Sequence, residues 1–323
     1  MLHKLKEYRN DIKNALNAFL DDVQHTTFEE EAMERLIAIA KRGKLIRGSL
    51  MLHASDSLGE RCDPRLAAGY ELIHTGILAH DDIIDNDDIR RGVKSIPKQY
   101  ENTRDPEGIA ICVGDIAIVR GIRAMFEVND VDRHPAILKL LKDVERTGGG
   151  QIADITRMKS PSTVTKEALF DVFENKTSHY TLTAPLLVGM YPYIGSDDEE
   201  AILKIGKHMG IAFQLRDDYL CYLPEDITGK NQFNDVIENK PTVIRILMEK
   251  ENQAISNLYG KKRFSDFERN LLEKTFRQVK DTYEKEIQTH KSVAESTLHE
   301  MDLPTHFVND MLELNEFLCT RKH

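Results

Sequence analysis

The sequence predicts an all-α protein, because apolar residues recur at helical spacing while the alternating pattern typical of β-strands is scarce. Of the 323 residues, 41% are hydrophobic and 30% are charged, a balance typical of a globular chain. No linker rich in Gly, Ser or Pro and no repeat of fixed period divides the chain. We therefore expect a single large helical domain over residues 1–323, with about ten or more helices.

The predicted helices follow from stretches with apolar residues three and four positions apart. In chain order these stretches are Leu16–Leu20, Met33–Ala40, Leu66–Leu78, Ile109–Met125, Ala201–Leu223 and Leu271–Tyr283. Glycine and proline separate them, for example at Gly59 and Pro106. The segment SDDEEAIL, which starts at Ser196, has the cap residue and early acids of a helix start. The charged region 249–300 is expected to form solvated helical faces.

Charge and cysteine content exclude several classes of protein. A net charge of -10 argues against nucleic-acid binding, which needs a basic surface. The four cysteines are widely spaced, contain no CxxC pair and predict reduced thiols: Cys62, Cys112, Cys221 and Cys319. The first residues lack the apolar stretch of a signal peptide, and no apolar run approaches about 18 residues. We expect a cytoplasmic protein without a transmembrane segment.

One segment, ELIHTGILAHDDIIDNDDIRRG at 71–92, ends an apolar helix in a cluster of aspartates. On a continuing helix, Asp81, Asp85 and Asp88 would share one face. Like charges four residues apart cost an isolated helix only about 0.2–0.5 kcal/mol per pair, so an isolated cluster is usually a solvated helix end. The alternative is a site for Mg²⁺, which binds through one or two carboxylates together with substrate phosphates.

A second acidic pair and several basic residues favour the metal site. Asp217 and Asp218 close another apolar helix, and two such helix ends would face one another across a cavity. Diphosphates require guanidinium and ammonium groups. Candidates are Lys44 and Arg47 at i,i+3, the pair Arg90–Arg91, and downstream Lys176, Lys230 and Lys240. Acids for metal together with bases for phosphate indicate a metal–diphosphate site.

Six motifs in order complete the pattern: GKLIRG, ELIHTG…HDDIIDNDDIRRG, GGGQIAD, NKTSHYT, FQLRDDYL…TGK and NDVIENKPT. Together they span residues 43–242, and they resemble the motifs of the trans-isoprenyl diphosphate synthases, or polyprenyl synthetases. The resemblance implies the all-α isoprenoid synthase fold, in which the helices surround a central cavity. It also implies a prenyltransferase that condenses isopentenyl diphosphate with an allylic diphosphate, uses three Mg²⁺ ions and forms a homodimer.

The resemblance assigns roles to residues of this chain. It implies Mg²⁺ ligation by Asp81, Asp85 and Asp217, with Asp82 and Asp218 beside them. It implies binding of isopentenyl diphosphate by Lys44, Arg47, His74 and Arg91, and of the allylic diphosphate by Arg90, Lys176, Lys230 and Lys240. Thr177 and Gln214 would lie near the developing allylic cation.

One departure stands in the second acidic motif. The family pattern has an acid at its last position, where this chain has Cys221, and a thiol is a poor Mg²⁺ ligand. We expect weaker binding of the third metal rather than loss of activity. Two functions are alternatives to the prenyltransferase. One is a class I terpene cyclase, which needs no isopentenyl site, and the other is a non-catalytic partner subunit, which would have lost its aspartates.

Product length depends on the residues just before Asp81. In farnesyl synthases of the family one or both of these positions hold bulky aromatics, whereas this chain has Gly76 and Ile77. The next large side chain upstream, Tyr70, lies roughly 9 Å beyond Gly76 along a helix. Phe126 is an alternative floor for the tunnel. We expect geranylgeranyl diphosphate as the main product, with medium- or long-chain polyprenyl and farnesyl diphosphates as alternatives.

Overall fold

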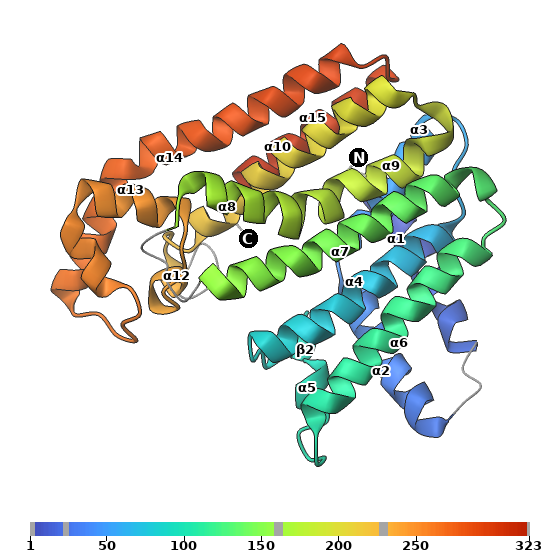
Figure 1. Cartoon of the computed structure of the whole chain (residues 1–323), viewed down its shortest axis with the longest axis horizontal. Coiled ribbons are helices and arrows are strands. Elements are labelled where there is room, and N and C mark those ends of the chain that lie inside the picture. Colours follow the sequence, from blue (N-terminus) through green and yellow to red (C-terminus); the bar gives the residue numbers. More distant parts are fainter. Residues whose placement is uncertain (1–3, 22–25, 158–163, 226–231, 322–323) are drawn as a thin grey trace. The chain divides into compact units, whose positions relative to one another are not determined.

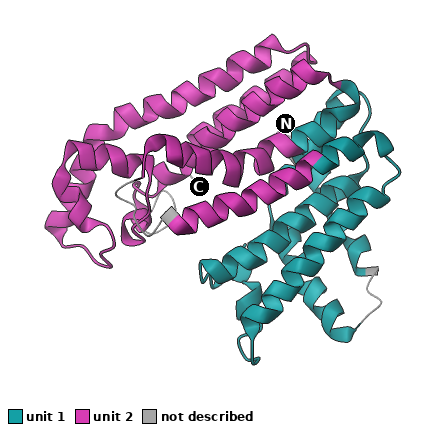
Figure 2. Cartoon of the chain, in the orientation of Figure 1, with its two compact units in different colours: residues 1–138, 185–193 teal, residues 139–184, 194–323 magenta. Residues whose placement is uncertain are grey.

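A computed structural model describes residues 4–21, 26–157, 164–225 and 232–321. Helices dominate these residues, and β-structure is limited to one two-stranded hairpin, so the predicted all-α class is confirmed. The chain forms two compact units (Figure 2): residues 1–138 with 185–193, called unit 1, and residues 139–184 with 194–323, called unit 2. No helix within the described ranges is long and apolar enough to cross a membrane.

Unit 1 is a helical bundle with the hairpin between two of its helices (Figure 1). Its elements are α1 (Leu5–Asp21), α2 (Thr27–Arg42), α3 (Ile46–Ser57), α4 (Pro64–Ile84), β1 (Ile89–Arg90), β2 (Val93–Lys94), α5 (Ile96–Gln99), α6 (Pro106–Glu127) and most of α9 (Ala184–Met190). Side chains such as Tyr8, Leu36 and Tyr70 are fully buried and form its core.

Two glycine pairs allow α4 and α6 to pack closely. A Cβ at Gly76 would lie 2.7 Å from the carbonyl oxygen of Gly114, and one at Gly69 would lie 2.7 Å from that of Gly121. The glycines are seven residues apart on each helix, so two turns of each helix repeat the same contact. Gly76 therefore faces the α6 backbone. The prediction that it flanks a hydrocarbon tunnel is wrong, because α6 occupies the space beside it.

Unit 2 contains the longest helices of the chain. Its elements are most of α7 (His134–Arg157), α8 (Lys166–Phe173), a π-helix (Glu174–Thr183), α10 (Ser196–Leu220), α12 (Asn234–Ile237), α13 (Val243–Glu251), α14 (Asp266–Glu300) and α15 (Thr305–Thr320). Helices α10, α14 and α15 lie side by side (Figure 1). The expected apolar stretch from Leu271 is part of one continuous helix, α14, which carries much of the charged region.

Candidate active site

The first acidic segment closes α4. The helix ends at Ile84, and Asp85 is its C-cap residue, with φ -87° and ψ -7°. Asp81 is partly buried and Asp85 is exposed, one turn apart on the helix. Asp88 lies beyond the helix end, and its carboxylate pairs with Lys98 Nζ at 2.9 Å. The prediction that Asp88 shares the helix face is therefore wrong, whereas Asp81 and Asp85 remain on it.

Arg90 lies among the aspartates of this segment. Its Nε donates to Asp82 Oδ1 at 2.6 Å, and its Nη2 donates to Asp87 Oδ2 at 2.7 Å and lies 3.9 Å from Asp81 Oδ2. Burial raises the pKa of Asp82, and the Arg90 guanidinium opposes this shift. Arg90 thus offsets the mutual repulsion of three carboxylates.

Unit 1 brings all four residues predicted to bind isopentenyl diphosphate to one cavity of about 500 Å³: Lys44, Arg47, His74 and Arg91. Helix α3 begins at Ile46, and Leu45 before it has a left-handed φ of 50°. Lys44 therefore precedes the helix, so Lys44 and Arg47 do not lie on one helix face. The turn at Leu45 nevertheless leaves both side chains at the same cavity.

The charges in this cavity favour an anionic ligand. Arg47 Nη1 lies 3.1 Å from His74 Nε2. Burial, with Arg47 and Arg91 nearby, lowers the pKa of His74 well below its usual value, so His74 is neutral at pH 7. Glu71 is fully buried, and burial raises its pKa, although Oε1 accepts the Gly48 N–H at 2.9 Å. The cationic side chains therefore dominate the cavity.

The hairpin after the aspartates separates Arg90 from Arg91. Arg91 and Gly92 both have positive φ, 54° and 78°, as a two-residue turn of type I′ requires. Arg91 Nη1 donates to the carbonyl oxygens of Ile39 and Ala40, each at 3.1 Å. The turn thus directs Arg91 to the cavity beside α2, while Arg90 stays with the aspartates.

In unit 2, Asp217 and Asp218 occupy different environments near the end of α10. Asp217 is partly exposed, and its Oδ1 accepts Arg321 Nη2 at 2.7 Å. Asp218 is buried; its Oδ1 accepts Gln214 Nε2 at 3.2 Å, and its Oδ2 has no hydrogen-bond partner among the described residues. Burial, with Asp235 nearby, raises the pKa of Asp218 well above its usual value. Asp217 is thus the more accessible carboxylate, and its present partner is a cation.

The departure at Cys221 places a thiol beside a buried carboxylate, Asp235. Burial and Asp235 raise the pKa of the Cys221 thiol, which therefore stays protonated at neutral pH. Lys240 Nζ lies 2.8 Å from Glu238 Oε2 and 3.7 Å from Asp235 Oδ1. Asp235 is thus an acidic residue of this region that the sequence did not single out. Lys230 lies outside the described residues.

Lys176 and Thr177 lie in the π-helix, a wide-turn geometry that is frequent at functional sites. Lys176 Nζ pairs with Asp154 Oδ2 at 2.6 Å, so the NKTSHYT and GGGQIAD motifs meet in unit 2. A Cβ at Gly150 would lie 2.8 Å from the backbone nitrogen of Lys176, which explains a glycine there. The role of Asp154 was not predicted, although its motif was.

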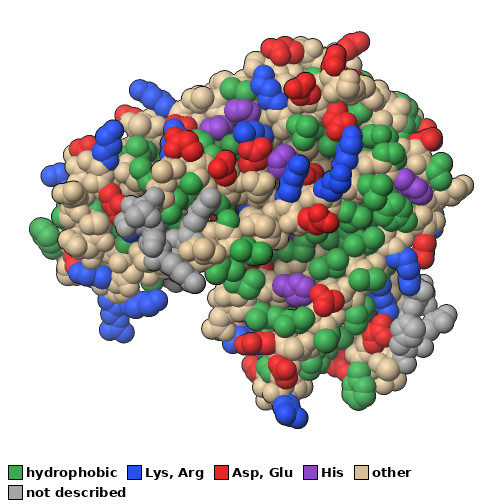
Figure 3. All heavy atoms as spheres, viewed as in Figure 1, with side chains coloured by type: hydrophobic (Ala, Val, Ile, Leu, Met, Phe, Trp, Pro, Cys, Tyr) green, Lys and Arg blue, Asp and Glu red, His purple; other side chains and the backbone are tan. Residues whose placement is uncertain are grey.

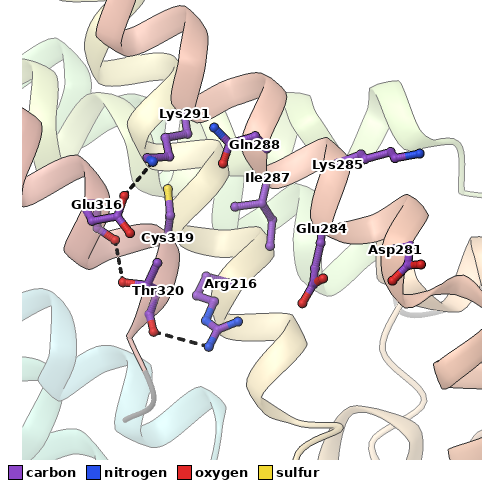
Figure 4. A pocket seen from close by; sticks show the side chains of 10 residues that line it. All are labelled: Arg216, Asp281, Glu284, Lys285, Ile287, Gln288, Lys291, Glu316, Cys319 and Thr320. Atoms are coloured by element: carbon purple, nitrogen blue, oxygen red, sulfur yellow. Dashed lines mark hydrogen bonds and ion pairs between the residues drawn. The ribbon is translucent and has the colours of Figure 1, made fainter.

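A separate cavity of about 590 Å³ lies among α10, α14 and α15 (Figure 4). Its charged lining is mixed, with three basic side chains, Arg216, Lys285 and Lys291, and three acidic ones, Asp281, Glu284 and Glu316. Arg216 Nε donates to the carbonyl oxygen of Arg321 at 2.8 Å. This cavity contains none of the predicted site residues, but its Arg216 holds the C-terminal segment whose Arg321 reaches Asp217.

Carboxylate oxygens are the ligands that Mg²⁺ prefers, and the acidic segments supply them. Within the described residues no group of three or more His, Cys, Asp and Glu side chains is arranged to hold a metal ion. Mg²⁺ often binds proteins through one or two carboxylates and completes its shell with water and phosphate. The Arg321 guanidinium at Asp217 is consistent with a position that accepts a cation.

Comparisons with known proteins identify the family. The family model for polyprenyl synthetase matches residues 29–277. A short chain isoprenyl diphosphate synthase of Methanothermobacter thermautotrophicus is 31% identical over 268 residues, which cover 79% of each chain. A geranylgeranyl diphosphate synthase of Saccharolobus solfataricus is 28% identical over 252 residues, covering 75% of this chain and 73% of that protein.

Solved structures support the fold. A geranylgeranyl pyrophosphate synthase from Corynebacterium glutamicum, complexed with isoprenyl diphosphate and magnesium, superposes with a TM-score of 0.81 at 24% identity, covering 98% of this chain and 99% of that one. A decaprenyl diphosphate synthase from Rhodobacter capsulatus gives a TM-score of 0.81 at 22% identity and covers 99% of each chain. The chain belongs to the polyprenyl synthetase family, and it is an all-α prenyltransferase of the trans-prenyl diphosphate synthases.

Proposed function

We propose that the protein condenses isopentenyl diphosphate with an allylic diphosphate, and that its main product is geranylgeranyl diphosphate. The observation that carries the proposal is the cationic cavity of unit 1, where Lys44, Arg47, His74 and Arg91 converge. A terpene cyclase has no second diphosphate to bind and no use for such a cavity. A non-catalytic subunit would not need the aspartates Asp81 and Asp217, which this chain keeps.

In the proposed reaction the allylic C–O bond breaks, and the double bond of isopentenyl diphosphate attacks the resulting cation. The diphosphate that leaves with the broken C–O bond then accepts a proton from the condensed cation, which forms the new double bond. Lys44, Arg47 and Arg91 hold the diphosphate of the acceptor, while neutral His74 supports Arg47 without adding charge. Positioning the two substrates and excluding water from the cation account for much of the rate.

The allylic diphosphate would be bound by Arg90, Lys176 and Lys240. Each of these cations pairs with a carboxylate, at Asp82, Asp154 and Glu238 respectively. A bound diphosphate would displace these carboxylates from the three cations or bind the cations together with them. We propose that Thr177 and the amide of Gln214 lie near the allylic cation.

We propose that Asp81, Asp85 and Asp217 hold Mg²⁺, three ions in all. The bound metal would neutralise charge that develops on the leaving diphosphate. The protein's contribution is to keep these carboxylates accessible: Arg90 offsets repulsion near Asp81, and Asp217 is partly exposed. The structure of the Corynebacterium glutamicum synthase, which contains magnesium and isoprenyl diphosphate, supports this proposal.

The product length rests on Ile77. This residue is partly exposed and lies four residues before Asp81, on the same face of α4. A growing chain anchored at Asp81 would pass Ile77, whose medium-sized side chain does not block it as an aromatic ring would. Relatives with geranylgeranyl products, such as that of Saccharolobus solfataricus, support the choice. Farnesyl and longer polyprenyl products are the alternatives to be distinguished by assay.

We further propose a homodimer. On α6, the side chains of Ile111 and Val119 are 47% and 63% exposed. They lie about two turns apart on one face of the helix. On α7, Ile152 and Ile155 are 69% and 45% exposed. Hydrophobic side chains are visible at the surface in Figure 3 along these helices. Exposed apolar stripes of this kind are typical of subunit interfaces.

The test supplies purified protein with isopentenyl diphosphate, Mg²⁺ and, in separate reactions, allylic primers of five, ten and fifteen carbons. Products are identified by mass spectrometry after removal of the diphosphate. The proposal expects twenty-carbon product from each primer. Cyclic hydrocarbon formed without isopentenyl diphosphate would instead identify a cyclase, and no turnover with any primer would favour a non-catalytic subunit.

A further inference from the structure

The turn that carries Lys240 has an unusual backbone. After α12, Asn239 adopts a left-handed φ of 60°. Its N–H donates to the Val236 carbonyl at 3.2 Å, and the Lys240 N–H donates to the Asp235 carbonyl at 2.9 Å. This pair of bonds is the Schellman pattern that ends helices, more often with glycine at the left-handed position. The turn brings Lys240 back toward Asp235 and Glu238.

A buried guanidinium holds this turn. Arg245, only 4% exposed, donates from Nη1 to the backbone oxygen of Asn239 at 3.2 Å and to its side-chain Oδ1 at 3.0 Å. The same Nη1 lies 3.5 Å from the Lys240 carbonyl oxygen. On its other side, Nε donates to Glu249 Oε1 at 2.9 Å. Arg245 therefore fixes both the backbone and the side chain of the left-handed residue before Lys240.

The same arginine links the turn to the second acidic motif. Its guanidinium carbon lies 4.0 Å from the centre of the Tyr259 ring, a cation–π contact. The Tyr259 hydroxyl is 2.9 Å from the Tyr222 hydroxyl, and Tyr222 directly follows Cys221. One buried side chain thus connects the segment after Asp217 with the turn that presents Lys240.

We propose that Arg245 is a positioning residue for Lys240: it fixes the turn so that the Lys240 ammonium group is held ready for the substrate diphosphate. This inference rests on the proposed role of Lys240. Arg245 itself is buried and acts only through the turn. Without it, the left-handed residue Asn239 would lose the hydrogen bonds that hold its backbone and side chain. Lys240 would then regain side-chain freedom that must be lost again on binding.

The test is a double-mutant cycle with Lys240→Met, Arg245→Met and the double variant. Binding of inorganic diphosphate in the presence of Mg²⁺ is measured by calorimetry, and the KM of the allylic primer by turnover. Lys240→Met is expected to weaken diphosphate binding about tenfold, as the loss of one charge-assisted hydrogen bond implies. Arg245→Met should weaken it about three- to tenfold, and the double variant should be no weaker than Lys240→Met alone.

Arg133→Met is the matched control. Arg133 is also 4% exposed and donates to a backbone carbonyl, that of Val188, but it belongs to unit 1 and has no link to Lys240. It should lower the melting temperature without changing diphosphate affinity. Far-ultraviolet circular dichroism confirms that each variant is folded. Because Arg245→Lys cannot reproduce the two-sided hydrogen bonding of a guanidinium, it should bind diphosphate nearly as weakly as Arg245→Met.

Two results would overturn the inference. Wild-type diphosphate affinity in folded Arg245→Met, or losses that multiply in the double variant, would show that Arg245 does not act through Lys240. Wild-type affinity in Lys240→Met would remove the role of Lys240 itself. Turnover by the wild-type protein tests the proposed condensation separately. If the wild type turns over and either of these results is found, only the inference about Arg245 and Lys240 fails.

Discussion

Replacing Gly76 by alanine separates two possible roles of this glycine. The added Cβ would lie 2.7 Å from the Gly114 carbonyl oxygen, 3.0 Å from Ile118 Cγ1 and 3.2 Å from Ala117 Cβ. A backbone oxygen in the middle of α6 cannot rotate away, so α4 and α6 must separate by several tenths of an ångström. Overpacking of this kind typically costs about 1–3 kcal/mol.

Alanine also stabilises a helix relative to glycine by about 1 kcal/mol, and this gain must be subtracted. Gly148→Ala provides the control, because Gly148 lies in α7 and a Cβ there meets nothing within 4 Å. We expect the free energy of unfolding of Gly76→Ala to fall about 1–3 kcal/mol below that of Gly148→Ala, measured by urea denaturation. Because Gly76 faces α6, the product distribution of Gly76→Ala should match that of the wild type.

Ile77→Phe provides the complementary change on the partly exposed face of α4. It should shorten the product, because the ring would lie one turn before Asp81, and it should cost little stability. The reasoning would be refuted if Gly76→Ala were as stable as Gly148→Ala and made shorter products. That result would place open space beside Gly76, where the structure has the α6 backbone.

Three further predictions concern catalysis and stability. Turnover should cease in EDTA and return with Mg²⁺, and Asp217→Ala should lower kcat by several orders of magnitude; near wild-type kcat would remove the metal role. Arg47→Ala should mainly raise the KM for isopentenyl diphosphate, and an effect confined to the allylic primer would contradict the assignment of the cavity. Burial, together with His208, whose Nδ1 lies 2.9 Å from His290 Nδ1, lowers the pKa of His290 to about 4. As the pH falls, His290 therefore binds a proton in the unfolded chain before it does so in the folded protein. Stability should therefore decrease from about pH 6.5 toward pH 4, by on the order of 2–3 kcal/mol, and unfolding of His290→Gln should be less pH-dependent over this window.

The helical class and four of the residues that line the cationic cavity of unit 1 could be predicted from sequence, because both depend on local patterns. Apolar spacing marks helices, and motif order marks the basic residues. The side chains converge through features that the sequence did not reveal. Lys44 reaches the cavity through the left-handed turn at Leu45, and Arg91 reaches it through the Arg91–Gly92 hairpin turn. Neither turn carries the usual Asn-Gly signal.

Long-range packing explains the other differences. The sequence suggested open space beside Gly76, because glycine has no side chain. The residue that packs against it, Gly114, lies 38 positions further along the chain. Only the tertiary structure shows that the two helices meet there. Asp235 and Arg245 were missed for a similar reason, since their importance lies in contacts with Cys221, Lys240 and Tyr259 across turns.

Both acidic segments violate a local rule of helix stability. The C-terminal end of a helix carries partial negative charge, so aspartates there are unfavourable. Yet Asp85 caps α4, and Asp217 and Asp218 lie in the last turn of α10. The guanidinium groups of Arg90 and Arg321 offset part of this repulsion. Local violations of this kind are expected where function requires them.

This conflict gives a last prediction, on Asp85→Asn. Asparagine removes one negative charge from the α4 end, so without Mg²⁺ the variant should be more stable than the wild type by about 0.3–1 kcal/mol. Adding Mg²⁺ with inorganic diphosphate should stabilise the wild type more than the variant, because the variant lacks one of the proposed metal ligands. Exposed Asp132→Asn, on the 3-10 turn Val131–Arg133 of unit 1 and in neither acidic segment, is the control and should change neither quantity. Equal stabilisation of both proteins by Mg²⁺ and diphosphate would show that the α4 aspartates have no part in metal binding.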